Sequence, residues 1–271
     1  MGVQNKGKKL QNLFSFRFSE NIWRVMPDAD PDSSLWAIEL RNAELREVSF
    51  AVIDTDSFMV RWQRQVEGTD WWTSLTAFAD NRYYLHNYRY PEVPEPTDLL
   101  AVNAETGLLS WVLANHLLVK NAGKGLLEVA IKQGDSFKHQ HCNASTGELL
   151  PLNTSLPESA DAIILAEPVR YIEGNMYFDR LAQFISDATG GHIPVAIDYL
   201  EKRPYIIFSY YIYEQDKTVQ YLLIVTDQKQ QVLHEKLSEE REGTGRSTMM
   251  LKASTLVYLK NSNEFSSLTL S

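Results

Sequence analysis

Short runs of apolar and aromatic residues, separated by polar turns, recur along most of the chain. Leu99 to Val112, LLAVNAETGLLSWV, shows the pattern, because alternating apolar residues run into a polar tip and a second apolar run follows. Alternation with a period of two predicts a β-strand, and a glycine-containing tip between two such runs predicts a β-hairpin. We therefore expect a hairpin here, with its tip at Thr106-Gly107.

The same tip recurs downstream at regular steps. Thr146-Gly147 and Thr189-Gly190 follow at steps of 40 and 43 residues, and Lys229-Gln230 gives a weaker copy after another 40. A period of 40 to 50 residues is typical of β-propeller blades. Upstream, LRNAELREVSF resembles the same stretch and sets Phe50 at the position of Trp111.

Further runs between these tips predict strands: AIILAEPV, NMYFDRLAQF, YIIFSYYIY and STLVYL. No segment predicts a long amphipathic helix. A single hairpin cannot bury its apolar face, so several hairpins are expected to stack around a common axis. The segment around Leu13–Phe18 is expected to pair with strands from the C-terminal end, since a propeller closes in this way.

The predicted fold class is all-β, a β-propeller of five or six irregular blades of antiparallel strands. It is expected to be closed by pairing of its N- and C-terminal strands. We expect a single domain over residues 1–271, with a flexible N-terminus over residues 1–11.

Composition narrows the function classes. Hydrophobic residues make up 44% of the chain and charged residues 23%, and the net charge of -9 comes without a long basic block, which argues against nucleic-acid binding. The single cysteine, Cys142, excludes an intramolecular disulfide. The sequence predicts no membrane association, because it has no apolar run of about 20 residues. The opening MGVQNKGKKLQNLF lacks the features of a signal peptide, so we expect a cytoplasmic protein.

The stretch at Leu99 to Val112 resembles the blade repeat of quinoprotein-type β-propellers. The residues that carry the resemblance are Leu100, Asn103, Thr106, Gly107 and Trp111. The resemblance implies a propeller fold with Thr-Gly in the turn and tryptophan in packing between blades. The quinoproteins' metal and cofactor ligands have no match here, so no cofactor is expected. Residues 22–111 also resemble an uncharacterised family of bacterial single-domain proteins, which implies no activity.

One interval breaks the repeat period. From Leu45 to Thr106 is 61 residues, about 20 more than the usual step, and the extra material contains DWWTSLTAFADNRYYLHNYRYPEVPEP. Insertions in repeat proteins often lie on the binding face. An alternating strand would place four rings on one face, those of Tyr84, His86, Tyr88 and Tyr90, and Trp72 lies nearby in the sequence. The predicted ligand-binding residues are Trp72, His86, Tyr88 and Tyr90. The alternative, that these rings only fill space between blades, stays open.

Two other groups of residues, the histidines of KHQHC and a set of carboxylates, are candidates for metal binding and for catalysis. In KHQHC, His139 and His141 share one strand face and Cys142 lies on the other, so no metal site is expected. Carboxylates set around a propeller axis can hydrolyse glycosides. The candidates here are Asp54, Asp56, Glu173, Asp179, Asp187 and Asp198.

These observations predict a non-catalytic binding or interaction module whose ligand is an unidentified small molecule or protein. The alternative is a hydrolase that acts on a sugar or related small molecule through carboxylates in the central funnel. The sequence leaves open whether the protein is an enzyme.

Overall fold

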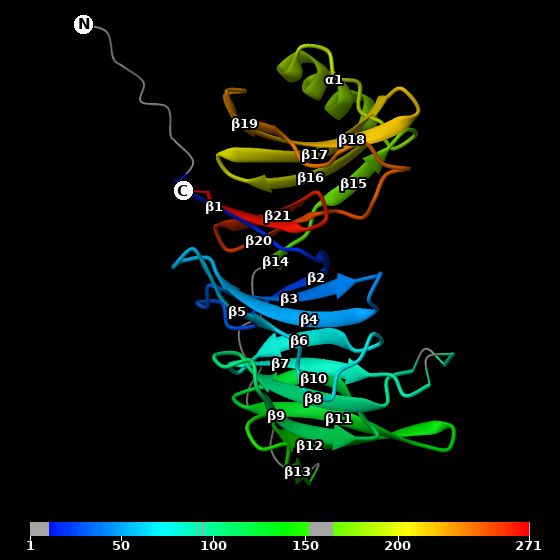
Figure 1. The fold of residues 1–271 in the computed structure, drawn as a ribbon. Coiled ribbons are helices and arrows are strands. Elements are labelled where there is room, and N and C mark those ends of the chain that lie inside the picture. The colour runs from blue at the N-terminus through cyan, green and yellow to red at the C-terminus, as the bar shows by residue number, and fades with distance from the viewer. Residues whose placement is uncertain (1–10, 91, 94, 152–164, 271) are drawn as a thin grey trace, which may run out of the picture. The chain divides into compact units, whose positions relative to one another are not determined.

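The protein is described here from a computed structural model, which covers residues 11–90, 92–93, 95–151 and 165–270. These residues form five antiparallel sheets of four or five strands each (Figure 1). The N- and C-terminal strands lie in one of the sheets. The predicted fold class is therefore confirmed, with five blade-like sheets, the lower of the two expected numbers. The predicted flexible segment, residues 1–11, falls almost entirely outside the described residues.

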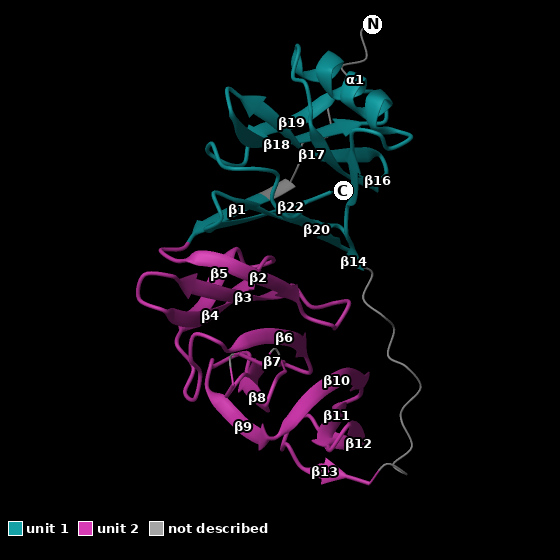
Figure 2. Ribbon diagram, turned by 90° about the vertical axis from the view of Figure 1, so that its right-hand side faces the viewer, with its two compact units in different colours: residues 1–17, 164–271 teal, residues 18–163 magenta. Residues whose placement is uncertain are grey.

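The chain divides into two compact units (Figure 2). Unit one consists of residues 1–17 and 164–271, and unit two of residues 18–163.

Unit two contains three sheets, each of four strands that follow one another in the chain. The first sheet is β2(Asn21–Pro27), β3(Leu35–Asn42), β4(Glu47–Asp54) and β5(Met59–Arg64). The second sheet is β6(Ser74–Ala79), β7(Arg82–Asn87), β8(Asp98–Asn103) and β9(Leu109–Ala114). The third sheet is β10(His116–Gly123), β11(Leu126–Gln133), β12(Ser136–Asn143) and β13(Leu149–Leu150).

Apolar side chains fill the space between successive sheets of unit two. Phe50 and Trp62 from the first sheet pack with Tyr83 and Leu100 from the second, and the rings of Trp62 and Tyr83 stack with centroids 5.5 Å apart. A separate cluster joins the second sheet to the third through residues such as Tyr84, Leu99, Leu127 and Val129. The middle strands bury side chains on both faces, which explains why they appear in the sequence as nearly continuous apolar runs.

Unit one contains two sheets of five strands. The fourth sheet is β15(Val169–Ile172), β16(Ala196–Lys202), β17(Tyr205–Glu214), β18(Lys217–Thr226) and β19(Gln231–Lys236). The fifth sheet is β1(Gln11–Arg17), β14(Leu165–Ala166), β20(Met249–Lys252), β21(Thr255–Lys260) and β22(Glu264–Thr269). A core that includes Ile207, Leu222, Leu256 and Leu268 lies between the two sheets.

The two ends of the described chain meet in the fifth sheet. β1 pairs antiparallel with β22, with Phe16 opposite Phe265 and Arg17 opposite Glu264. A 2.7 Å ion pair joins Arg17 and Glu264. This pairing confirms the expectation that the segment around Leu13–Phe18 joins the C-terminal strands.

The expected strand and hairpin around Thr189-Gly190 are wrong, because this segment is helical. α1 runs from Phe178 to Thr189, and Gly190 ends it in a left-handed conformation, with φ +76°. Its apolar residues recur at the helical spacing of three and four and pack on the fourth sheet (Figure 1). They are Phe178, Leu181, Ala182 and Ile185. The Thr-Gly pair therefore marks a helix C-terminus here and not a strand turn.

The other expected tips lie in turns between antiparallel strands. Gly107 and Gly147 have positive φ in the turns after β8 and β12, and Lys229 has positive φ in the turn between β18 and β19. The turns after β8 and β12 share one construction. The side-chain oxygens of Asn103 and Asn143 each accept hydrogen bonds from the backbone two and three residues later.

The upstream copy that the sequence predicts has the same turn construction but a different place in its sheet. LRNAELREVSF forms the turn between β3 and β4, where the Asn42 side-chain oxygen accepts from the backbone N–H groups of residues 44 and 45 and Arg46 has positive φ. The turn with the same place in its sheet as Asn103–Gly107, between the third and fourth strands, joins β4 to β5 and begins at Asp54. The Asp54 carboxylate accepts from the backbone N–H groups of residues 56 and 57, and Phe58 takes the positive φ that Gly107 has. Trp62, and not Phe50, therefore corresponds to Trp111.

Candidate functional site

The corrected repeat shows where the extra residues of the second sheet lie. Asp54 and Asn103 are 49 residues apart, against 40 between Asn103 and Asn143, so the excess is smaller than the sequence suggested. It falls in two connections. The first is residues 65–73, which join β5 to β6; the equivalent connection in the next sheet, from β9 to β10, is a single residue. The second is residues 88–97, which join β7 to β8; the equivalent connection from β11 to β12 has two residues.

The connection over residues 65–73 is held by its own side chains and by β7. The Asp70 carboxylate accepts hydrogen bonds from the backbone N–H groups of Trp72 and Thr73 at 2.9 and 3.2 Å. The Thr73 hydroxyl donates to the Asn87 side-chain oxygen at 2.6 Å, and the Asn87 amide donates to the Gly68 carbonyl at 2.9 Å. The loop that carries Trp72 is therefore fixed to the sheet on both sides.

A buried ion pair anchors this loop to the first sheet. Glu39 and Arg41 lie on the same face of β3, and a nitrogen of Arg41 is 2.7 Å from a Glu39 oxygen. The second Glu39 oxygen accepts from the backbone N–H of Leu75 at 2.8 Å. Arg41 also donates to the carbonyl oxygens of Trp71 and Thr73. Both residues that flank Trp72 are thus bonded to one guanidinium group.

Two tryptophan rings lie against the same guanidinium. Its central carbon is 5.3 Å from the ring centroid of Trp23, on edge strand β2, and 4.9 Å from that of Trp71. Trp23 is 63% exposed and Trp72 is 48% exposed, although large aromatic residues are ordinarily buried. We refer to Trp23 and Trp71, which contact Arg41, together with Trp72, which follows Trp71 in the chain, as the tryptophan cluster.

His86, a predicted ligand contact, lies near the end of β7 and is 7% exposed. Its Nε2 atom accepts a 2.9 Å hydrogen bond from the backbone N–H of Leu118 in β10. Burial, with a smaller effect from the charge of Arg24, lowers the pKa of His86 from 6.5 to about 4. The neutral imidazole therefore links the second sheet to the third.

The predicted strip of rings ends at residue 87, because β7 stops there. Tyr88 is half-buried and Tyr90 is 59% exposed, and both lie in the connection that follows. This connection is held by Arg89, whose Nε donates to the Asp98 carboxylate at 3.0 Å. Pro91 and Pro94 of the PEVPEP run lie outside the described residues.

Of the four predicted site residues, Trp72 alone belongs to the tryptophan cluster. The prediction did not include Trp23, Glu39 and Arg41. One signal was present in the sequence, since WAIELRN alternates glutamate and arginine on one face of an otherwise apolar strand. Charges at such positions are buried only when they are paired, so they indicate a specific polar contact.

The carboxylates proposed for the hydrolase alternative include two that are held by arginine. Asp54 is 2.7 Å from Arg61 and accepts from the Ser34 hydroxyl, also at 2.7 Å. Asp198, in unit one, is 2.7 Å from Arg170. Burial alone would raise the pKa of Asp54, but these hydrogen bonds outweigh it and hold that pKa well below its usual range. Asp54 is thus held ionised in an ion pair, and Asp198 also has an arginine as its partner.

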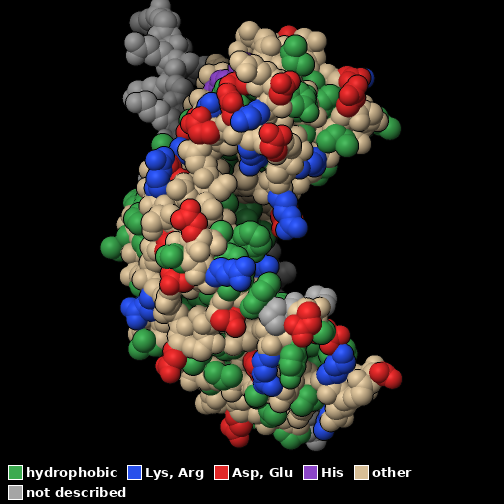
Figure 3. Space-filling model, turned by 45° about the vertical axis from the view of Figure 1, so that its right-hand side comes forward, with side chains coloured by type: hydrophobic (Ala, Val, Ile, Leu, Met, Phe, Trp, Pro, Cys, Tyr) green, Lys and Arg blue, Asp and Glu red, His purple; other side chains and the backbone are tan. Residues whose placement is uncertain are grey.

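Three further observations concern metals, membranes and charge. In the part of the chain that the structure describes, no three His, Cys, Asp or Glu side chains are placed to share a metal ion. Within the same residues, no helix has the length and apolar character needed to span a membrane. Acidic and basic side chains are interspersed on the face shown in Figure 3.

None of the curated proteins matches this chain. Solved structures similar to it include a member of the DUF4221 family from Bacteroides vulgatus, with 6% identity, TM-score 0.37 and 97% of each chain covered. The β-propeller domain of Cps50 (Swd1) from Myceliophteria thermophila is similar at 7% identity and TM-score 0.35, with 97% of this chain and 99% of that chain covered. The β-propeller domain of the Trilobed protease from Pyrococcus furiosus is similar at 11% identity and TM-score 0.32, over 87% and 74% of the two chains. Among family models, residues 29–111 match a domain of unknown function, DUF4905, which covers most of the segment for which an uncharacterised family was expected.

Proposed function

We propose that this protein is a binding module and that Trp23 and Trp72 form the contact surface for its ligand. The observation that carries the proposal is the fixed and exposed position of Trp72. Its side chain is 48% exposed, while the carbonyl groups of the residues before and after it are both bonded to buried Arg41. An exposed aromatic side chain on a fixed backbone binds with little loss of conformational entropy.

The charges around the cluster indicate the kind of ligand. Arg41 carries the central positive charge, and Glu39 neutralises it at 2.7 Å. The guanidinium is also covered by two indole rings, so little of its charge is available to a ligand. Flat apolar surface is what the cluster offers. An uncharged ligand with a flat face, such as a pyranose ring, fits this surface by stacking.

The test is a binding screen with a panel of neutral oligosaccharides, followed by native mass spectrometry of each complex. Wild-type protein is expected to retain at least one member of the panel. Trp23→Ala and Trp72→Ala are each expected to weaken that binding at least tenfold, because hot-spot aromatic residues dominate such contacts. Both variants should keep the wild-type melting temperature, since each removes a largely exposed ring.

Phe137→Ala provides the matched control, because Phe137 is equally exposed, at 48%, but lies on β12 in the third sheet. This variant should bind as wild type does. Equal binding by wild type and both tryptophan variants would contradict the proposal, as would a complete lack of binding across the panel.

A further inference from the structure

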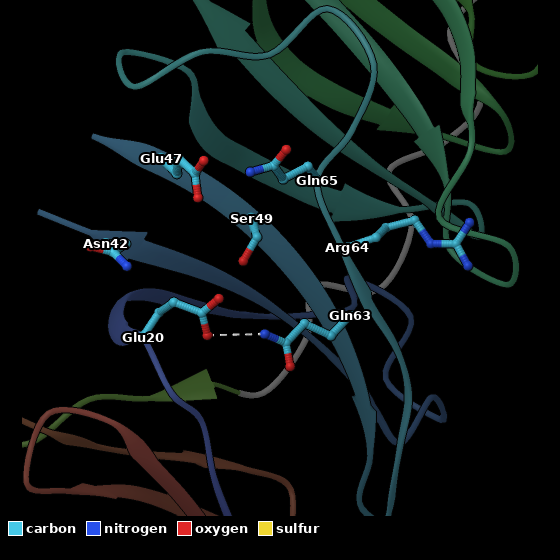
Figure 4. A pocket seen from close by; sticks show the side chains of 7 residues that line it. All are labelled: Glu20, Asn42, Glu47, Ser49, Gln63, Arg64 and Gln65. Carbon is cyan, nitrogen blue, oxygen red and sulfur yellow. Dashed lines mark hydrogen bonds between the residues drawn. The ribbon is translucent and has the colours of Figure 1, made fainter. Parts of the chain in front are cut away.

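The first sheet carries a polar hollow that is distinct from the tryptophan cluster (Figure 4). Its volume is about 220 Å³, and all its lining residues belong to unit two. The lining residues are Glu20, Asn42, Glu47, Ser49, Gln63, Arg64 and Gln65. Figure 4 shows that Arg64 extends away from the other six side chains, and its guanidinium carbon lies 5.9 Å from the Trp62 ring centroid.

Ser49 lies in the hollow with its hydroxyl group unpaired. The residue is only 9% exposed, and its Oγ atom is buried without a hydrogen-bond partner. Figure 4 shows this hydroxyl directed toward the space between Glu20 and Gln63. Buried hydroxyl groups in folded proteins almost always have a partner, so an unpaired one that faces a hollow indicates a missing polar group.

Two carboxylates face the same space without a cation. Glu20 accepts hydrogen bonds from Ser19 at 2.7 Å and from Gln63 at 3.0 Å, which fixes its position. Glu47 is exposed at the start of β4. Neither carboxylate has an ion-pair partner within the described ranges of the chain. With Arg64 turned away, the hollow presents two negative charges, amide oxygens and a hydroxyl.

We propose that this hollow binds a small aliphatic diamine or polyamine. Each ammonium group carries three N–H donors, which carboxylate, amide and hydroxyl oxygens accept. Two carboxylates on one hollow match two ammonium groups on one chain. A hollow of about 220 Å³ is larger than a single metal ion needs and has room for a short organic chain.

The experiment is isothermal titration calorimetry of the full chain with three probes. These are 1,4-diaminobutane, its uncharged counterpart 1,4-butanediol, and calcium chloride. We expect 1,4-diaminobutane to bind with one-to-one stoichiometry and to bind more weakly as sodium chloride is raised from 20 to 300 mM, because salt screens exposed charges. The salt series uses wild-type protein and so does not depend on any variant.

Glu20→Gln and Glu47→Gln should each weaken diamine binding at least tenfold while leaving the melting temperature unchanged. Glu148→Gln is the matched control, because Glu148 lies five residues after Asn143 as Glu47 lies five residues after Asn42, and it does not line the hollow. That variant should bind as wild type does.

Each remaining outcome would overturn the proposal. Equal affinity for 1,4-butanediol would mean that charge is not recognised. Calcium binding that excludes the diamine would identify a metal site instead. Failure of the diamine to bind at millimolar concentration would leave the hollow without this ligand class. None of these outcomes bears on the tryptophan cluster, since the two sites share no residue.

Discussion

The indole N–H of Trp111 donates a 3.0 Å hydrogen bond to the carbonyl oxygen of Ala144, in the turn that follows β12. The same ring lies over Gly147, where a Cβ atom would approach it to 2.8 Å. Trp62 makes the equivalent 2.7 Å bond to Ala104 and lies over Gly107. One contact, in which a tryptophan from the last strand of a sheet covers the turn of the next sheet, therefore joins the three sheets of unit two.

We expect Trp62→Ala to lower the free energy of unfolding by about 3 to 5 kcal/mol, because it removes a buried ring and leaves a cavity. Trp62 is 8% exposed and stacks on Tyr83. Trp111 is half-buried, so Trp111→Ala should cost less. Urea unfolding measures the free energy of unfolding of both variants. Trp23→Ala is the control: Trp23 is 63% exposed, so the stability of this variant should lie within about 0.5 kcal/mol of wild type. Equal stability of all three variants would contradict a structural role for the contact.

Gly107→Ala should destabilise the protein more than Gly134→Ala. Both glycines have positive φ, at +68° and +61°, so each substitution carries a conformational cost of about 1 to 2 kcal/mol. At Gly107 the added methyl group would also lie 2.9 Å from the Trp62 ring, whereas at Gly134 it would meet nothing within 4 Å. The overpacking should add about 1 to 3 kcal/mol.

A double-mutant cycle separates the two contributions at Gly107. In the Trp62→Ala background the added methyl group meets no indole, and the remaining close atom, Cδ of Arg64 at 3.0 Å, belongs to a flexible side chain that can move away. Gly107→Ala should then cost about as much as Gly134→Ala does. If Gly107→Ala cost as much in that background as in the wild type, the Trp62 ring would not be the cause of the cost.

Arg41→Met should lower the free energy of unfolding by about 3 to 5 kcal/mol, because it leaves the fully buried Glu39 carboxylate without its cation. It should also speed hydrogen exchange of the Thr73 and Leu75 amides, because the anchor of their loop is lost. Arg203→Met removes an ion pair to Glu201 whose arginine side chain is 91% exposed, and it should change stability by less than about 1 kcal/mol. Comparable losses in both variants would argue against a special role for the buried pair.

The stability of the protein should fall as pH is lowered from about 6.5 to about 4, with a contribution from His86. Its pKa is about 4 in the folded state and near 6.5 when unfolded, so in this window the unfolded chain binds a proton that the folded chain does not. The contribution of His86 to the free energy of unfolding is complete above about pH 6.5 and declines by about 1.4 kcal/mol per pH unit below it. Denaturant unfolding of wild type and His86→Gln across this range measures the difference, which should narrow as pH falls. If the free energies of unfolding of the two proteins changed in parallel with pH, the lowered pKa of His86 would be contradicted.

Much of the fold follows from local sequence. Period-two alternation in LLAVNAETGLLSWV places apolar side chains on the faces of β8, and the asparagine side chain caps the turn through bonds that span only three residues. Because these causes lie within one short stretch, the repeat could be recognised without knowledge of the rest of the chain. The pairing of terminal strands followed from the same pattern and the need to cover sheet edges.

The helix and the register of the first repeat show where local patterns are ambiguous. Thr-Gly ends a helix at Gly190 as readily as it turns a hairpin at Gly107, because both need only a residue that accepts positive φ. The copy at Asp54 has neither asparagine nor glycine, and Phe58 takes the positive φ instead. A tryptophan follows eight residues after Asp54 and after Asn103, but Pro151 stands at that place after Asn143. Each of the two tryptophans covers the turn of the neighbouring sheet.

The sequence alone determined strands, turns and an all-β class, because these arise from contacts between residues close in the chain. Only the tertiary structure decided what the aromatic and charged residues do. His86 and Trp72 are near neighbours in one stretch, yet the first is enclosed against β10 and the second is left exposed by a loop bonded to Arg41. Burial depends on residues that are more than 30 positions away, and the surroundings of a side chain are set by the packing of whole sheets, which no local pattern records.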